Sequence, residues 1–145
     1  MRLINFLVSL LLLFVASFSF AQNIHVENPI QKFPKTNEGE ILNFKYPLIN
    51  QSKDTIYIKQ PEVDCSCTEV IIPFEYLLPG EKNEIQIKFD TKHKIGWQEI
   101  VVQLEFYNSK KYKETIPVIF KGNVKATKAT KQLYKEQQKQ IKSKN

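Results

Sequence analysis

The sequence predicts an all-β protein: a seven-stranded antiparallel β-sandwich, preceded by a cleaved export signal and followed by a basic tail. Apolar and polar residues alternate with a period of two through most of residues 22–124, which is typical of half-buried strands. Turn-forming stretches recur at intervals of roughly 8–12 residues, the spacing of antiparallel sandwiches. No helical period separates the strands, so the pattern does not favour a parallel α/β sheet.

Residues 1–21 are predicted to be a cleaved signal peptide. Arg2 precedes an apolar run at residues 6–15, and two small residues, Ser19 and Ala21, occupy the −3 and −1 positions of a cleavage point. The alternative is an uncleaved membrane anchor, because the whole apolar stretch approaches the length of a membrane span. Since polar residues dilute the stretch, we expect cleavage and an exported protein, periplasmic or secreted.

The positive charge of the chain is concentrated at its C-terminus. The whole chain carries a net charge of +6, and residues 125–145 hold seven lysines and one acid. Residues 22–124 are therefore nearly neutral, so we expect no nucleic-acid partner. Residues 125–145 include few large apolar side chains, which predicts a disordered tail or a frayed helix. Its lysines predict possible contact with an anionic membrane surface, and a merely solvated tail is the alternative.

The first four strands are predicted near residues 24–26, 42–48, 56–58 and 70–72. In the second of these, alternate apolar residues from Leu42 to Leu48 share one face. Pro47 lies inside that strand and predicts an edge position or a bulge, because proline cannot donate to a neighbouring strand.

The last three strands show the clearest alternation. Their predicted inward side chains are Ile85, Ile87 and Phe89; Ile100, Val102, Leu104 and Phe106; and Ile116, Val118 and Phe120. Polar residues occupy most of the alternate positions, which indicates one buried and one exposed face for each strand.

Several short motifs follow one another in a recognisable order. They are Cys65-Ser66-Cys67-Thr68, Leu78-Pro79-Gly80-Glu81-Lys82, residues 85–91 (IQIKFDT) and Phe120-Lys121-Gly122-Asn123-Val124. On these motifs the domain at residues 22–124 resembles a bacterial exported family of unknown function that is marked by a Cys-Gly-Cys-Thr signature. It is also similar to the PapD, major sperm protein and ASH group of sandwiches. The resemblance implies an immunoglobulin-like fold and an envelope location, but no established activity. Ser66 replaces the usual glycine of the signature.

Cys65 and Cys67 are the only cysteines and the first candidate site. One interpretation is core packing, because Val63, Cys65 and Cys67 would share one face of a continuing strand. A second is a disulfide, which export permits. Positions i and i+2 of an extended strand lie about 6.6–6.8 Å apart at Cα, at the limit for a bridge, so a turn or bulge would be required.

Such a disulfide would close a very small ring. Its entropic stabilisation is only about 1.6 kcal/mol, and we expect it to be easily reduced, which favours a redox-active pair over a structural one. The third interpretation is a metal site formed by the two thiolates of Cys65 and Cys67. Cu(I) suits this pair better than zinc, which normally takes four ligands.

No other catalytic pattern is present: the sequence lacks a Gly-rich phosphate loop, a Gly-X-Ser-X-Gly elbow and a His-Glu-X-X-His motif. We therefore predict a non-enzymatic envelope domain without catalytic residues or cofactor. We expect it to bind an unidentified protein partner, with addition of a partner strand to a sheet edge as the expected mode. The alternative function is a thiol redox or Cu(I)-binding protein that uses Cys65 and Cys67.

Overall fold

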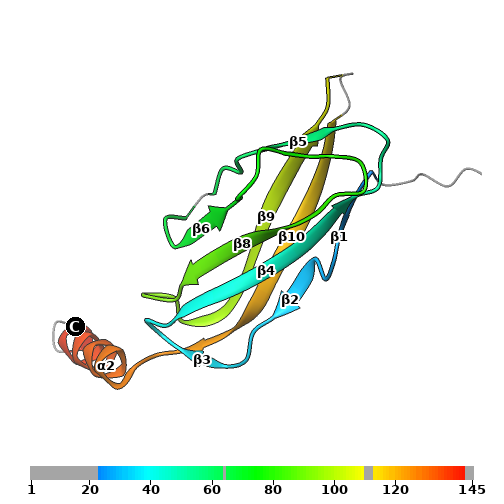
Figure 1. The fold of residues 1–145 in the computed structure, drawn as a ribbon. Coiled ribbons are helices and arrows are strands. Elements are labelled where there is room, and N and C mark those ends of the chain that lie inside the picture. The colour runs from blue at the N-terminus through cyan, green and yellow to red at the C-terminus, as the bar shows by residue number, and fades with distance from the viewer. Residues whose placement is uncertain (1–22, 64, 110–112, 143–145) are drawn as a thin grey trace, which may run out of the picture.

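The protein is seen in a computed structural model that describes residues 23–63, 65–109 and 113–142. The predicted signal peptide at residues 1–21 lies outside the described residues. The described chain forms ten strands and one helix, and the strands build two sheets that pack face to face (Figure 1). The predicted all-β sandwich is confirmed.

The first sheet has four antiparallel strands in the order β1-β4-β8-β6. Its centre is the long pair of β4 (Ile41–Asn50) and β8 (Lys82–Asp90), flanked by β1 (Ile24–Val26) and β6 (Thr68–Ile71). Tyr46, Ile85 and Phe89 are fully buried on its inner face, as the alternation predicted.

The second sheet has the order β2-β10-β9-β5-β7, with β3 also on β10. Its strands are β2 (Ile30–Lys32), β3 (Thr36–Asn37), β5 (Ile56–Lys59), β7 (Tyr76–Leu77), β9 (Gly96–Tyr107) and β10 (Lys113–Lys125). β2 and β3 run parallel to β10, whereas an antiparallel sandwich was predicted. The count also exceeds seven, because strands of two or three residues are too short to show a period in the sequence.

A single apolar core fills the space between the sheets. Phe44 and Phe120 stack with their ring centroids 4.5 Å apart, and Phe89 packs against Phe120. Phe33, which leads from β2 to β3, is also buried in this core. Its ring lies against Gly122 of β10, where an added Cβ would be 2.5 Å from Cδ2 of Phe33. The closing Gly122 of the sequence motif is thus explained by close packing.

Pro47 lies in the interior strand β4, in unbroken register with Glu84 of β8, and not at an edge or a bulge as predicted. Its carbonyl accepts a hydrogen bond from the N–H of Glu27, 2.8 Å away, so its ring nitrogen also faces the β1 side. Pairing with β1 ends at Leu48. The N–H that Pro47 lacks would therefore point to a position beyond the end of β1, so the sheet tolerates a proline there.

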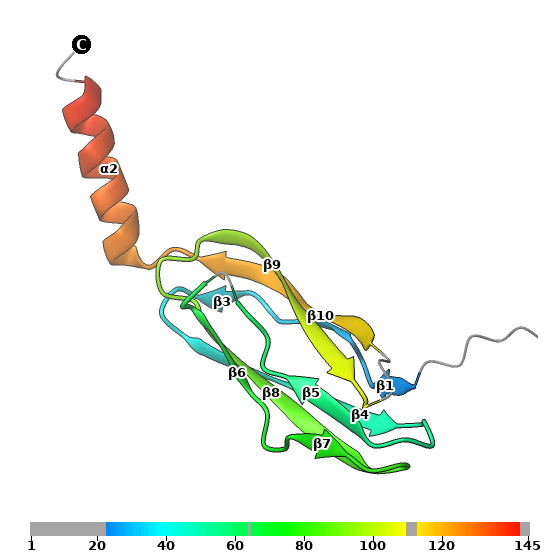
Figure 2. The same ribbon diagram turned by 90° about the horizontal axis from the view of Figure 1, so that it is seen from above.

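The basic tail continues as helix α2 (Lys128–Lys142), which projects from one end of the sandwich (Figure 2). Thr127 caps it, because its hydroxyl accepts the N–H of Thr130 at 3.2 Å. Glu38 from the loop after β3 accepts the hydroxyl of Thr130 at 2.6 Å. The Glu38 side chain is only 7% exposed, and this hydrogen bond is the main reason that its pKa lies below the ordinary value of 4.5. No helix among the described residues is long and apolar enough to cross a membrane.

Candidate functional site

The outer edge of β9 is open along most of its length. β5 pairs with β9 only from Tyr57 opposite Tyr107 to Lys59 opposite Glu105, while β9 pairs with β10 as far as Gly96. Residues 96–104 of β9 therefore have a strand neighbour on one side only among the described residues. A strand edge of this length can accept a further strand.

Backbone directions show which groups the open edge presents. The N–H of Ile119 donates to the carbonyl of Pro29 on the far side of β10, at 2.7 Å, so the even-numbered residues of β10 face β9. Their partners in β9 are also even-numbered. The N–H and C=O groups of the intervening residues consequently face the open edge: Trp97, Glu99, Val101 and Gln103.

Pro61 explains why β5 does not continue along β9. Ile58 donates its N–H to Glu75 on the β7 side, so Tyr57 and Lys59 direct their backbone groups to β9. The next residue whose backbone N–H and C=O would point to β9 is Pro61, opposite Gln103. Because proline has no N–H, it cannot form that hydrogen bond. The chain leaves the sheet, and this part of the β9 edge has no strand partner among the described residues.

A groove of about 340 Å³ lies along this edge. One wall is formed by the segment that leads into β6, and the other by β9; the lining residues are Glu62, Val63, Cys65, Thr68, Glu99, Ile100, Val101, Val102 and Gln103. We call this the β9 groove. Among the described lining residues, the ionisable side chains are those of Glu62 and Glu99, and most of the others are apolar. The groove runs along residues 99–103 of β9, so it can accommodate several residues of an extended chain.

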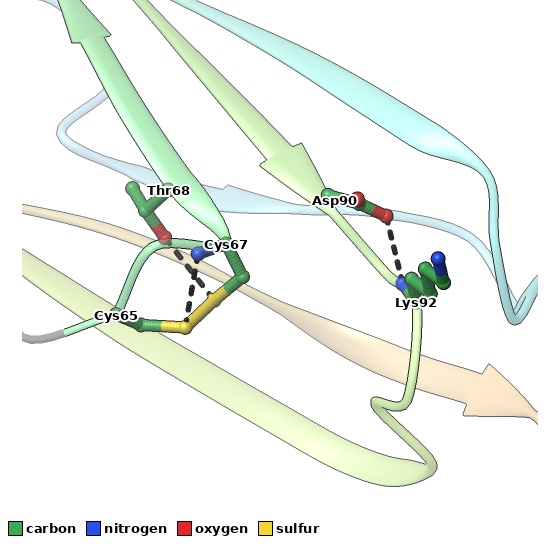
Figure 3. Close-up of a disulfide and its surroundings, with 5 residues drawn as sticks. All are labelled: Cys65, Cys67, Thr68, Asp90 and Lys92. Atoms are coloured by element: carbon green, nitrogen blue, oxygen red, sulfur yellow. Dashed lines mark hydrogen bonds between the residues drawn. A yellow bond between two sulfur atoms is a disulfide. The ribbon is translucent and has the colours of Figure 1, made fainter.

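Cys65 and Cys67 lie in the turn before β6 (Figure 3), and Cys65 forms part of the groove wall. The N–H of Thr68 donates to the carbonyl of Cys65 at 3.0 Å and closes the turn. The two Cα atoms are 5.1 Å apart and the sulfur atoms are joined in a disulfide. The turn thus brings the cysteines closer than an extended strand could.

The core-packing interpretation holds only in part and only for Cys67, because the strand on which it relied does not continue. Val63 is 37% exposed, and both cysteines are half-buried instead of buried. Only Cys67 packs against the apolar core, whereas Cys65 lines the β9 groove. The two sulfur atoms therefore have different surroundings.

Hydrogen bonds fix the turn on both sides of the disulfide. The N–H of Cys67 points to Sγ of Cys65 at 3.2 Å, and the hydroxyl of Thr68 lies 3.8 Å from Sγ of Cys67. The carbonyl of Cys67 accepts the N–H of Asp90, 2.8 Å away at the end of β8. The turn is thereby attached to the first sheet while it faces the edge of the second.

Comparison with known families and structures agrees with this architecture. Residues 24–124 match the family described as "Protein of unknown function (DUF1573)". The chain belongs to this family. The DUF1573 domain thus spans the whole sandwich and excludes helix α2. The match does not establish the Cys-Gly-Cys-Thr signature, although Cys65 and Cys67 are present. No curated protein matches the chain in sequence.

Solved structures show the same fold at low sequence identity. The ASH/PapD-like domain 7 of human CEP192 has a TM-score of 0.59 and 15% identity, over 77% of this chain and 98% of that domain. The periplasmic chaperone SfaE has a TM-score of 0.54 and 10% identity, over 72% of this chain and 57% of the chaperone.

The Vibrio cholerae VesB protease has a TM-score of 0.60 and 9% identity, over 70% of this chain but only 32% of the protease chain. At such identities these similarities describe the fold alone. They confirm the predicted immunoglobulin-like sandwich.

A metal site at Cys65 and Cys67 of the DUF1573 domain would require the two reduced thiolates. The structure brings together no group of three or more histidine, cysteine, aspartate or glutamate side chains among its described residues. Joined in a disulfide, Cys65 and Cys67 offer no thiolate to a metal. The predicted Cu(I) site therefore concerns only the reduced protein, and it stays a prediction.

Proposed function

We propose that this DUF1573 domain captures an extended segment of a partner protein, which adds as a strand to the open edge of β9. The observation that carries this proposal is the direction of the backbone groups of Trp97, Glu99, Val101 and Gln103. Their N–H and C=O groups face the β9 groove without a strand partner among the described residues. An added strand would satisfy these groups, and its alternate side chains would contact the groove walls.

The groove admits a single extended segment better than the edge of a second folded sheet. The wall formed by Glu62, Val63, Cys65 and Thr68 stands opposite β9, with Val63 and Cys65 turned toward the strand. A second copy that paired through its own β9 would have to bring its own wall into the same groove, whereas a single extended segment has no such wall. The proposed partner is therefore an unpaired stretch of polypeptide.

The proposed location is outside the cytoplasm, periplasmic or secreted. It is supported by the predicted signal peptide and by a disulfide, which persists in oxidising compartments. The similarity in fold to SfaE, a periplasmic chaperone, is compatible with it. Capture of a segment by itself requires neither a reaction nor a cofactor.

Substitution of Val101 tests the capture. Val101→Pro removes one N–H from the open edge, and it leaves the ladder to β10 intact because that ladder uses the even-numbered residues. Val101→Ala is the matched control, since it shortens the same side chain and retains the N–H. The probe is a fluorescent, reduced and carboxymethylated unfolded protein, and binding is measured by fluorescence anisotropy.

We expect Val101→Pro to weaken binding by about tenfold, the equivalent of one or two lost hydrogen bonds, and Val101→Ala to bind nearly as well as the native chain. Thermal unfolding establishes that both variants are folded. Equal binding by the folded Val101→Pro and Val101→Ala variants, or no binding by the native chain, would contradict capture at β9.

A second proposed contact joins the tail to an anionic membrane surface. Five exposed lysines (Lys128, Lys131, Lys135, Lys139 and Lys142) recur at helical spacing and form one face of α2. The other side of the helix, with Leu133 and Tyr134, faces Glu38, His93 and Ile95 across a small cavity. The lysine face is thus directed away from the end of the sandwich.

Vesicle binding tests this second contact. Each lysine near an anionic lipid surface contributes about 1 kcal/mol, screened by salt. We expect binding to phosphatidylglycerol vesicles that is lost when the five lysines are replaced by glutamine, and no binding to phosphatidylcholine vesicles. Vesicle binding that is unchanged after removal of residues 125–145 would contradict the proposal.

A further inference from the structure

The two cysteines differ in their access to the β9 groove. Cys65 is part of the groove lining together with Val63 and Thr68, while Cys67 packs against the core. Across the groove lie Ile100 and Val102, whose side chains point between the sheets. A segment paired with β9 would direct every second side chain inward, toward this space. An inward side chain of the segment would therefore approach Cys65.

We propose that the β9 groove carries out thiol–disulfide exchange, through Cys65, with captured segments that contain a cysteine. This inference rests on the proposed capture at β9, and it names the class of segment that the groove serves. It joins the two features that the structure places on opposite walls of one groove, the open strand edge and the disulfide.

The exchange balances without a further reactant. The thiol of the segment loses its proton, and the thiolate attacks Sγ of Cys65. A new disulfide forms between the segment and Cys65 while the bond between Cys65 and Cys67 breaks. The electron pair of the broken bond remains on Sγ of Cys67, which takes up the proton. If the segment has a second thiol, that thiol can release the segment as an oxidised disulfide and leave Cys65 and Cys67 as two thiols.

The surroundings of the turn suit this sequence of steps. The hydroxyl of Thr68, 3.8 Å from Sγ of Cys67, can donate to the thiolate that leaves. The N–H of Cys67, 3.2 Å from Sγ of Cys65, can donate a hydrogen bond to the Cys65 thiolate that forms when the segment is released. One residue separates the two cysteines, so the ring gives little entropic resistance to opening. Because Cys67 stays packed beside Cys65, its thiolate can attack Sγ of Cys65 in the mixed disulfide, which closes the ring again and releases the segment as a thiol.

Single-cysteine variants test the proposal with a defined probe. In Cys67→Ser only the thiol at the groove remains, and in Cys65→Ser only the thiol at the core. The probe is a synthetic peptide of alternating valine and threonine with one central cysteine, activated as a mixed disulfide with thiopyridine. The release of thiopyridone gives the rate of reaction. Dipyridyl disulfide, which has no peptide backbone, serves as the reference reagent for each variant.

We expect the peptide to react at least about tenfold faster than the reference reagent with Cys67→Ser, because capture places its sulfur beside Cys65. This preference should disappear when Val101→Pro is added and should be absent from Cys65→Ser. A preference that is equal in both cysteine variants, or that survives Val101→Pro, would overturn the proposal.

Two further measurements separate the proposal from the capture on which it rests. Binding of a peptide with alanine in place of cysteine is followed by anisotropy. If it binds but the reactive peptide shows no preference, exchange fails and capture stands; if it does not bind, capture itself fails. The native protein is also mixed with the thiol form of the peptide and quenched with acid. Mass spectrometry should then locate the mixed disulfide on Cys65; its location on Cys67, or its absence, would contradict the exchange.

Discussion

Lys59 of β5 and Glu105 of β9 form the last cross-strand pair on the outer edge of β9. Lys113 of β10 lies 3.1 Å from the same Glu105 carboxylate, and it is the main reason that the pKa of Glu105 lies below the ordinary value. Beyond this charged pair no described strand pairs with the outer edge of β9 as far as Gly96. Two residues after Lys59 comes Pro61, which has no N–H to continue the ladder.

The first prediction concerns Pro61. Pro61→Thr supplies the missing donor and a residue that favours strands, so we expect β5 to extend along β9 and to compete with captured segments. Binding of the unfolded probe should weaken, and the amide of Gln103 should become protected from hydrogen exchange. Unchanged binding together with a protected Gln103 amide would show that the segment binds elsewhere.

The second prediction concerns the disulfide. Replacement of both Cys65 and Cys67 by serine should leave capture intact, because backbone groups of β9 supply the affinity. Since the ring is so short, the free energy of unfolding should fall by no more than about 1.6 kcal/mol through lost chain constraint. Denaturant unfolding and probe binding check the two parts. Loss of capture in the folded double variant would count against the edge as the binding element.

The third prediction concerns Gly122. An added Cβ would lie 2.5 Å from Cδ2 of Phe33 and 2.6 Å from its carbonyl oxygen. Gly122→Ala should therefore lower the free energy of unfolding by about 1–3 kcal/mol, measured by denaturant titration. In a Phe33→Ala background the same change should cost less, because the ring no longer obstructs the methyl group. An equal cost in both backgrounds would mean that the ring contact is not the cause.

The fourth prediction concerns the pH dependence of the tail helix. The pKa of Glu38 is lowered in the folded protein, first by the hydrogen bond from Thr130. The stabilising effect of the Glu38 carboxylate is therefore fully present above pH 4.5, the ordinary pKa of this group. It is lost as the pH falls through the lower pKa that Glu38 has in the folded protein. Circular dichroism should show more helix in the native chain than in Glu38→Gln at neutral pH, and this difference should vanish in acid. A difference that persists in acid would contradict the role of the carboxylate.

Much of the sandwich can be predicted from the sequence because apolar and polar residues alternate visibly along its long strands. Inward residues such as Phe89, Leu104 and Val118 are buried as the alternation predicts. The parallel pairing of β2 could not be found, since a strand of three residues has no measurable period. Nor does a period reveal the buried Phe33, which leaves its strand to fill the space above Gly122.

The candidate site was only half visible in the sequence. The cysteine pair stood out, but its parity with Val63 suggested a continuing strand where the structure has a turn. The open edge of β9 depends on which strand fails to pair, and this is a property of the sheet as a whole. One local signal was available: Pro61 limits β5 to a short strand, while β9 is much longer.

Residue-resolved amide hydrogen exchange along β9 tests the central proposal most directly. In the free protein the amides of Ile100 and Val102, paired with β10, should exchange slowly, while those of Glu99 and Val101 exchange quickly. Addition of the unfolded probe should protect the Glu99 and Val101 amides and leave the paired ones slow. If the probe binds and the Glu99 and Val101 amides still exchange as in the free protein, strand addition to β9 is wrong.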